Sequence, residues 1–212
     1  MNILLLGATG KTGQQILTQA LAAGHQVTAF VRSPEKMRQS QEDTTVIPGD
    51  ALDESAVEEV MQSAPFDVVI IAIGSASLKN QGIRARTTAN VVAAMQQHCA
   101  EARLWVVSSA GTGDSISQLG LFGKIFVKTV IAGPIQDHTF QERTVQDSRL
   151  PYTIVRPVGL TDGSVSGGAY VIKASGKMPG RWISRADVAH FIVQHLEKSA
   201  YDRQAVTLSA RE

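Results

Sequence analysis

Glycines stand at positions 7, 10 and 13, directly behind an apolar run at residues 1–6, and this spacing constrains the fold more than any other feature. The run predicts a buried strand, and the apolar positions Ile16, Leu17 and Ala20 predict an amphipathic helix behind the glycines. In such a turn the first glycine permits the sharp bend, the second lets backbone approach a phosphate, and the third lets the helix pack close to the strand. The helix N-terminus then points at an anion, so the sequence predicts a dinucleotide-binding turn.

Two other interpretations of this turn compete with dinucleotide binding. The sequence Gly10-Lys11-Thr12 matches the end of a P-loop, but that motif needs a glycine five positions before Gly10, where this chain has Leu5 inside the predicted strand. The other alternative is a glycine turn with a purely structural role. We favour the dinucleotide over both, because a strand precedes the turn and a helix follows it.

The residue after the second predicted strand, at 26–31, indicates which dinucleotide is bound. A site selective for NAD places an Asp or Glu near this point, where it accepts hydrogen bonds from the ribose 2′-OH. This chain has Arg32 instead, with Ser33 beside it and Lys36 one helical turn further on. A guanidinium can hold a 2′-phosphate through paired, charge-assisted hydrogen bonds. We therefore expect NADP(H) as the cofactor; the alternative is a solvated surface arginine.

The next two predicted strands, at 44–47 and 67–73, also end in residues suited to a cofactor site. Asp50 follows the first of them and could accept a hydrogen bond from the adenine amino group, while Ala51 packs on the ring. Asp50 could equally cap a helix or turn the chain ahead of it. Gly74 follows the second strand, which is nearly all apolar, and its small size would let a cofactor cross the sheet edge.

Helical and strand patterns alternate from the first residue to Pro157, which is typical of β-α units in a parallel sheet. The pattern loosens over 159–183, where we expect a loop-rich insertion on the substrate side with a short extended piece at 169–172. Helix returns after Ser184, a good N-cap, with Asp187 completing a capping box, and a last strand follows at 205–208. We therefore predict a single α/β domain over residues 1–212, a doubly wound Rossmann-type fold with a mainly parallel sheet and helices on both faces.

The composition argues against several classes of function. A net charge of +1 without a basic stripe gives no sign of nucleic-acid binding. No apolar run approaches membrane-spanning length, and no signal peptide opens the chain. The one cysteine, Cys99, allows no internal disulfide, so we expect a cytoplasmic protein in which Cys99 packs rather than reacts. The five histidines lack metal-ligand spacing, so no metal site is predicted.

Two further strand ends carry the residues expected beside a substrate. The strand at 103–107 ends at Ser108-Ser109, and the strand at 152–156 is followed by Pro157 and Val158. In an open parallel sheet the ligand lies over the carboxyl ends of the strands, so these two exits should flank the nicotinamide. The serine hydroxyls could bond a substrate, or the pair could form a turn with backbone hydrogen bonds. The predicted substrate-binding residues are Ser108, Ala110, Val158 and Gly159.

A familiar acid–base pair is missing from the chain. Standard short-chain dehydrogenases place a Tyr-x-x-x-Lys pair on the helix after the fifth strand, where the tyrosine shuttles the proton. No such pair occurs here, and alignment of that helix by its downstream strand puts Pro134 and His138 at the two positions. An alcohol–ketone dehydrogenase of the usual type is therefore disfavoured. The remaining expectation is a hydride site for an acceptor that takes its proton from solvent, such as a flavin or a conjugated tetrapyrrole.

The segment 119–135 is apolar and interrupted by Lys124 and Lys128. We interpret it as a core helix. The alternative is a lid over the substrate or an interface, because its apolar positions spread around more than one helical face.

Several motifs occur in an order that resembles a known family, and they are residues 7–13, Val31-Arg32, Gly49-Asp50, Asp137-His138, 152–157 and 183–188. Together with the missing Tyr-x-x-x-Lys pair, they resemble the atypical short-chain dehydrogenases/reductases of the NAD(P)-binding, NmrA-like group. Within that group the resemblance is to the branch of the biliverdin-IXβ and flavin reductases, and it spans nearly the whole chain.

The resemblance implies a cytosolic protein that binds NADPH and reduces flavins and certain linear tetrapyrroles. It implies a set of cofactor-binding residues: Gly7, Thr9, Gly10, Lys11 and Thr12 at the phosphates, Arg32 and Lys36 at the 2′-phosphate, Asp50 and Ala51 at the adenine, Ile73 and Gly74 along the cofactor, and His138 near the nicotinamide ribose. It also implies that Ser109 is the active-site serine. The chain departs from the family at Gly159, where the reductases have a histidine considered as a proton donor, and over residues 111–131.

The sequence therefore predicts an NADPH-dependent reductase that transfers hydride to a flavin or to a planar conjugated acceptor such as a linear tetrapyrrole, with Ser109 as the catalytic residue. The alternative is an NADP-binding redox sensor or assembly factor without catalysis, like NmrA. A sugar-nucleotide epimerase is disfavoured because the Tyr-x-x-x-Lys pair is missing. We expect a monomer or a weak homodimer.

Overall fold

The computed structural model describes residues 1–37, 44–74 and 79–211. Its strands are β1 (Asn2–Leu6), β2 (Gln26–Val31), β3 (Thr44–Pro48), β4 (Val68–Ile71), β5 (Arg103–Val107), β6 (Tyr152–Pro157), β7 (Gly159–Thr161), β8 (Tyr170–Lys173), β9 (Trp182–Ser184) and β10 (Gln204–Ala210). Its α-helices are α1 (Lys11–Ala22), α2 (Glu54–Gln62), α3 (Ile83–His98), α4 (Leu121–Thr129), α5 (Ala132–Asp147) and α6 (Arg185–His195). Short 3-10 helices are η1 (Pro34–Lys36), η2 (Gly113–Gln118) and η3 (Ser199–Tyr201).

The strands form one large sheet in the order β3-β2-β1-β4-β5-β6-β10-β8, beside a small sheet of β7 and β9. Neighbours in the large sheet run parallel except β8, which is antiparallel to β10. The strand order reverses at β1, where β2 lies on one side and β4 on the other. The predicted fold class, a doubly wound domain with a mainly parallel sheet, is confirmed.

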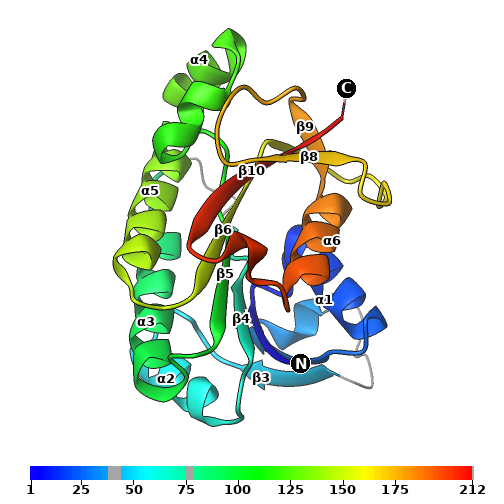
Figure 1. Ribbon diagram of the computed structural model, residues 1–212. Helices are drawn as coiled ribbons and strands as arrows, with labels where there is room; N and C mark the ends of the chain where they lie inside the picture. Colours follow the sequence, from blue (N-terminus) through cyan, green and yellow to red (C-terminus); the bar gives the residue numbers. More distant parts are fainter. Residues whose placement is uncertain (38–43, 75–78, 212) are drawn as a thin grey trace.

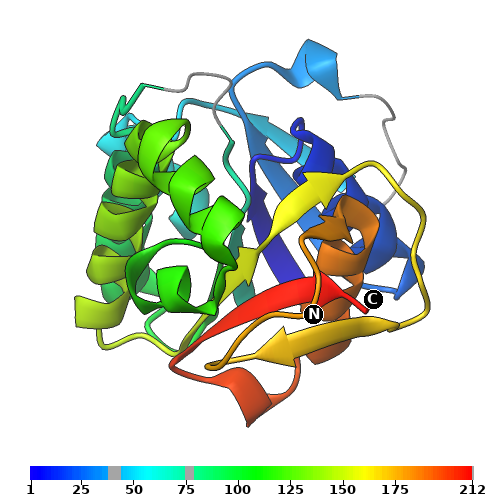
Figure 2. The ribbon, with the colours of Figure 1, turned by 90° about the horizontal axis from the view of Figure 1, so that it is seen from above.

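Helices cover both faces of the sheet, with α1 and α6 on one side and α2, α3 and α5 on the other (Figure 1; Figure 2 gives the view from above). The residues of β1 alternate between the two cores: Ile3 and Leu5 pack toward α1 and α6, whereas Leu4 and Leu6 pack on the opposite side. A strand buried on both faces reads as a continuous apolar run, which is why the sequence pattern located β1 and β4.

Most predicted elements occur close to their expected bounds, and β2 and β5 match them. The fourth strand is shorter than expected, because only Val68–Ile71 have strand geometry. Cys99 ends α3 and is half-buried, and burial raises the pKa of its thiol. A raised pKa keeps the thiol protonated, in agreement with the packing role that we expected for this residue.

The segment 159–183 is more structured than the sequence suggested. The extended piece expected at 169–172 is β8, but β7 and β9 were not predicted, because three-residue strands leave too short a pattern to detect. Ser184 caps α6 as predicted and accepts from the Asp187 backbone N–H. The prediction that Asp187 completes the capping box is wrong. Its carboxylate instead accepts hydrogen bonds from the backbone N–H and the hydroxyl of Ser166, both at 2.8 Å, and so anchors the loop to α6.

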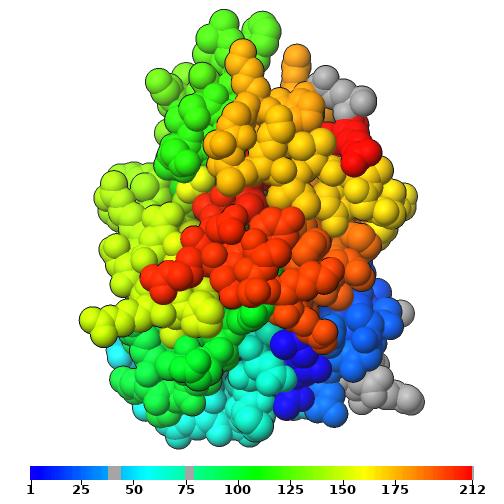
Figure 3. All heavy atoms as spheres, viewed as in Figure 1, coloured from blue at the N-terminus to red at the C-terminus, as the bar shows by residue number. Residues whose placement is uncertain are grey.

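The interpretation of segment 119–135 as a core helix is wrong. It forms α4 and the first turn of α5, and Val127 is the buried residue of α4. Leu121 and Phe122 are 71% and 76% exposed. Helix α4 stands at the top of the molecule beside the gold and orange segment that leads into β9 (Figure 3), rather than against the sheet. Within the described residues, no helix is both long and apolar enough to cross a membrane.

Candidate active site

The glycine turn between β1 and α1 has the geometry that its sequence predicts. Gly7 adopts a φ of 90°, and a Cβ there would lie 2.6 Å from the carbonyl oxygen of Ala72 on the neighbouring strand exit. A Cβ on Gly13 would lie 2.1 Å from the Gly7 carbonyl oxygen. The first glycine is therefore needed for the bend and the third for the close approach of helix and turn, as expected.

The N-terminus of α1 is suited to a phosphate group. Its N-cap residue, Gly10, offers no side-chain acceptor, and the first turn contains no acidic residue. The N–H groups at the start of a helix have no intrahelical partner, and the helix dipole favours a negative charge there. Together with the glycines, this fits a pyrophosphate more readily than any neutral ligand. Thr9 and Thr12 are half-buried in the turn.

One cation of the turn already has an ionic partner. The Lys11 Nζ lies 2.7 Å from a carboxylate oxygen of Asp162, and Arg185 Nη1 lies 2.5 Å from the other oxygen of the same carboxylate. Asp162 follows β7, so this exposed bridge connects the glycine turn with the segment that leads away from β6. The sequence did not point to Asp162 or to Arg185.

The residues predicted at the adenosine half lie along the ends of β2, β3 and β4. Arg32 and Lys36 are exposed, and neither has an ion-pair partner among the described residues. Asp50 accepts a hydrogen bond from the Leu52 N–H at 3.0 Å, so its turn-making role is present, while the cap of α2 is Asp53. The neighbours predicted to contact the cofactor, Ala51 and Ile73, are half-buried and Gly74 is exposed.

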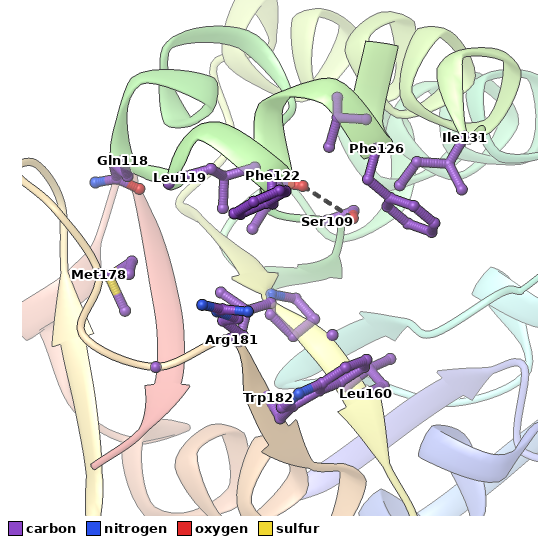
Figure 4. Close-up of a pocket in the computed structure, with 18 of the residues that line it drawn as sticks. Ser109, Gln118, Leu119, Phe122, Phe126, Ile131, Leu160, Met178, Arg181 and Trp182 are labelled. Carbon is purple, nitrogen blue, oxygen red and sulfur yellow. Dashed lines mark hydrogen bonds between the residues drawn. The ribbon is translucent and has the colours of Figure 1, made fainter. Parts of the chain in front are cut away.

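The exits of β5 and β6 open into a cavity of about 800 Å³. Of the predicted residues it brings together the two strand exits and one residue of α5: Ser108, Ser109, Ala110, Val158, Gly159 and His138. Unpredicted residues from two other segments complete the wall, and they include Gln118, Leu119, Phe122, Phe126, Met178, Arg181 and Trp182 (Figure 4). The size is in the range of cavities that hold drug-sized ligands.

The first serine of the pair is held by a buried ionic network. The Ser108 hydroxyl donates to the Glu142 carboxylate at 2.5 Å, and Arg156 donates to the same carboxylate through Nε at 3.0 Å and Nη2 at 2.6 Å. Arg156 also pairs with the exposed Asp114 at 2.7 Å. The Ser108 side chain thus faces α5, and its expected contact with a substrate stays a prediction.

Ser109 and His138 present the other polar side chains near the predicted hydride site. The half-buried Ser109 has a long hydrogen bond, 3.3 Å, to the Ala110 carbonyl. His138 Nδ1 lies 2.8 Å from Oε1 of Gln141, which in turn donates to Thr88. Burial, and then the charge of Arg84, lower the pKa of His138 to about 4. The imidazole is therefore neutral at physiological pH.

Aromatic and aliphatic side chains dominate the remaining wall. Phe122 and Phe126 come from α4 and are 76% and 51% exposed, because they face the cavity mouth instead of the core. Trp182 and Leu160 lie on the opposite side, with Arg181 between the two walls (Figure 4). Arg181 and Arg185 are cations of the wall, and no acidic side chain of the described residues lines it.

The sequence offered the α4 side of this apolar wall only as the alternative of a lid, and around Trp182 it predicted a substrate-side insertion without singling out that residue. The residues that line a ligand cavity are of the same types as those that fill a core, so the pattern of segment 119–135 did not separate the two. The spread of its apolar positions around the helix was the signal for the lid alternative, and a tryptophan inside a glycine-rich stretch was a signal for the opposite wall.

Comparisons with known proteins agree with this architecture. The model of the family described as NAD(P)H-binding matches residues 7–199. Reductase pytE of Aspergillus terreus is 26% identical over 255 residues, which cover 98% of this chain and 97% of pytE. The structure of the anaerobilin reductase ChuY from Escherichia coli O157:H7 superposes with a TM-score of 0.83 at 29% identity, over 99% of this chain and 97% of ChuY.

A short-chain dehydrogenase/reductase from Veillonella parvula, solved in complex with NADP, superposes with a TM-score of 0.77 at 20% identity, over 98% of this chain and 94% of the other. At that identity the likeness concerns the fold alone. The family match, in contrast, extends over most of the sequence and includes the glycine turn. The protein therefore belongs to the NAD(P)H-binding family, as a Rossmann-fold oxidoreductase similar to the atypical short-chain dehydrogenases/reductases.

Proposed function

We propose that this protein is an NADPH-dependent reductase that transfers hydride to a planar conjugated acceptor, a flavin or a linear tetrapyrrole, bound in the cavity beside Ser109. The observation that carries the proposal is the cavity itself: it is apolar, it opens at the carboxyl ends of β5 and β6, and it lies in a chain without the Tyr-x-x-x-Lys pair. ChuY, which is similar over nearly the full length, is named as a reductase of anaerobilin, and this supports a tetrapyrrole-like acceptor.

The cofactor's phosphates would lie on the N-terminus of α1, against the backbone of Gly7, Thr9 and Gly10 and the first turn at Lys11 and Thr12. Lys11 would then exchange its partner Asp162 for a phosphate. Arg32 and Lys36 would hold the 2′-phosphate, because both are exposed cations next to the end of β2. Asp50 and Ala51 would contact the adenine, and Ile73 and Gly74 would line the path across the sheet edge.

NADPH supplies the hydride when it is bound. The protein's part is to orient the acceptor and to exclude other reactions. Ser109 would donate a hydrogen bond to the acceptor, while Ala110, Val158 and Gly159 supply backbone and small contacts. His138, with its pKa lowered to about 4, is a poor proton donor at neutral pH, and it would orient the nicotinamide ribose instead. The proton would come from solvent at the open mouth of the cavity.

The charges of the wall narrow the class of acceptor. Arg185 pairs with Asp162, but Arg181 lines the cavity without an ion-pair partner among the described residues. An acceptor with a phosphate or a carboxylate therefore fits better than a neutral one. FMN and biliverdin both carry such groups on a planar conjugated ring. The insertion at 159–183 would form the wall of the cavity that contacts the acceptor.

Mixing the purified protein with NADPH and either FMN, FAD or biliverdin, and following the nicotinamide absorbance, tests the proposal. We expect turnover with at least one of them, and a lower KM for FMN than for riboflavin. Substitution of Ser109 by alanine should lower kcat, whereas Ser63→Ala, at a serine outside the cavity lining, serves as a matched control. If no acceptor supports NADPH oxidation although NADP raises the melting temperature, the alternative of a non-catalytic NADP sensor is favoured.

A further inference from the structure

The indole of Trp182 packs against Gly159, in space that the side chain of any other residue at position 159 would fill. The two residues face each other across the small sheet, with Gly159 paired to Trp182 in the β7–β9 register. A Cβ on Gly159 would lie 2.4 Å from Cε3 and 2.5 Å from Cζ3 of the indole. The six-membered ring of Trp182 therefore lies over the glycine, where any larger side chain would push it away.

The indole is not buried by this contact. Trp182 is 61% exposed, and it is one of the residues that line the cavity. Its ring therefore has one part against Gly159 and a large part open to the cavity, across from Phe122 and Phe126 (Figure 4). The other tryptophan, Trp105, is 1% exposed and packs edge-to-face against Phe191 in the core.

We propose that Trp182 is the specificity-determining residue for the acceptor: its exposed indole stacks on the planar conjugated ring, and Gly159 is required so that the indole can lie in that place. The inference rests on the proposed function. Stacking on an indole is a general means of holding a planar ring, because every flat π-system offers a face to it. Phe122 and Phe126 of α4 would contact the acceptor from the opposite wall of the cavity.

A structural role for Trp182 would be to cover Gly159 and stabilise the small sheet. The two roles make different demands on the residue. A covering residue needs bulk, so leucine would serve; a stacking residue needs an aromatic face, so phenylalanine would serve and leucine would not. The variants Trp182→Phe and Trp182→Leu therefore separate the two roles, and Phe140→Ala is a matched control because Phe140 is a 46% exposed aromatic outside the cavity.

The kinetic test measures KM and kcat for FMN and for biliverdin with saturating NADPH. We expect Trp182→Leu to raise KM about tenfold, with Trp182→Phe within about threefold of the parent, as a lost stacking contact requires. Gly159→Ala should also raise KM, because its Cβ displaces the indole and would lie 2.9 Å from the backbone carbonyl oxygen of Arg181. An unchanged KM in Trp182→Leu, in a protein whose melting temperature NADP still raises, overturns the proposal.

A second measurement uses the parent protein and needs no variant. N-bromosuccinimide oxidises exposed indoles, so Trp182 should react and the buried Trp105 should not. Saturating FMN should protect Trp182, with peptide mass spectrometry locating the oxidation. Turnover of FMN without protection refutes the stacking and leaves the reductase intact. Protection without turnover refutes the reductase and leaves the stacking intact, and the absence of both refutes both.

Discussion

Replacing Glu142 by glutamine would leave the buried Arg156 guanidinium with one counter-charge, the exposed carboxylate of Asp114 at 2.7 Å. Glu142 and Arg156 side chains are 4% and 3% exposed, and the carboxylate accepts from Ser108 Oγ, Arg156 Nε and Arg156 Nη2 at 2.5, 3.0 and 2.6 Å. A glutamine offers one oxygen in place of two, and its amide N–H groups would face the donors of Arg156. The variant keeps the volume of the side chain and removes only the charge and one acceptor.

The cost follows from the burial of both partners. Removal of one member of a buried ion pair costs about 3–5 kcal/mol, because the other charge then lacks its buried partner. Asp114 still pairs with Arg156 from the surface, so we take the lower end, about 3 kcal/mol. That is a large part of the roughly 5–15 kcal/mol that stabilises a typical domain. For a chain of this length, each kcal/mol shifts the melting temperature by about 2–4 °C, so we expect Glu142→Gln to lower it by about 6–12 °C.

Thermal and urea unfolding, followed by circular dichroism, measure this change. The control is Glu58→Gln, which removes a partially exposed pair with His98 and should cost less than about 1 kcal/mol. The double variant Glu142→Leu with Arg156→Met should regain much of the lost stability, since apolar residues of similar volume can replace a buried pair. If Glu142→Gln lowers the stability by less than about 1 kcal/mol, the network does not hold the β5 exit as we argue.

Three further predictions concern the cofactor and the core. Arg32→Asp should weaken NADP by about 10- to 100-fold, the worth of a lost charge-assisted contact, and NAD much less; calorimetry with both nucleotides measures the difference, and equal losses would contradict the 2′-phosphate assignment. Gly13→Ala should cost at least about 2 kcal/mol, because its Cβ would lie 2.1 Å from the Gly7 carbonyl oxygen; urea unfolding checks it, and an unchanged midpoint would mean that the turn relaxes easily. The pKa of His138, lowered from 6.5 to about 4 by burial, means that the unfolded chain binds this proton first, so stability present above pH 6.5 is lost as the pH falls toward 4. The loss approaches about 3 kcal/mol, and unfolding free energies against pH should show a smaller loss for His138→Asn than for the parent.

The sequence predicts the glycine turn better than the walls of the cavity, and the reason is physical. Gly7 is required by the positive φ of the turn, and Gly13 by its contact with the Gly7 carbonyl, so local spacing reveals both. Arg32 follows its strand directly and needs no tertiary information. The strands of the parallel sheet are buried on both faces, so their apolar runs also stand out.

The cavity depends on contacts between segments that are distant in the sequence, and no local pattern encodes such contacts. Phe122 and Trp182 come from opposite walls of the cavity, and each resembles a core residue in sequence. Asp187 shows the same limit at smaller scale: its spacing from Ser184 predicts a capping box, but the loop residue Ser166 takes its carboxylate. Ser108 likewise turns toward Glu142, a partner that lies 34 residues further along the chain.

The position of β10 has a consequence for how the protein is made. This strand comes last in the sequence but lies inside the sheet, between β6 and β8. The hydroxyl of Thr207 in β10 donates a hydrogen bond to the side chain of Gln118, and the backbone carbonyl of Gln118 accepts one from the Met178 N–H. The hydroxyl of Ser209, also in β10, accepts a hydrogen bond from the Gly180 N–H. Synthesis runs from the N-terminus, so β1 to β5 leave the ribosome well before β10, and domains generally fold as units. The wall around Met178 and Gly180 gains its support from β10, so the cavity cannot be complete until this strand has left the ribosome.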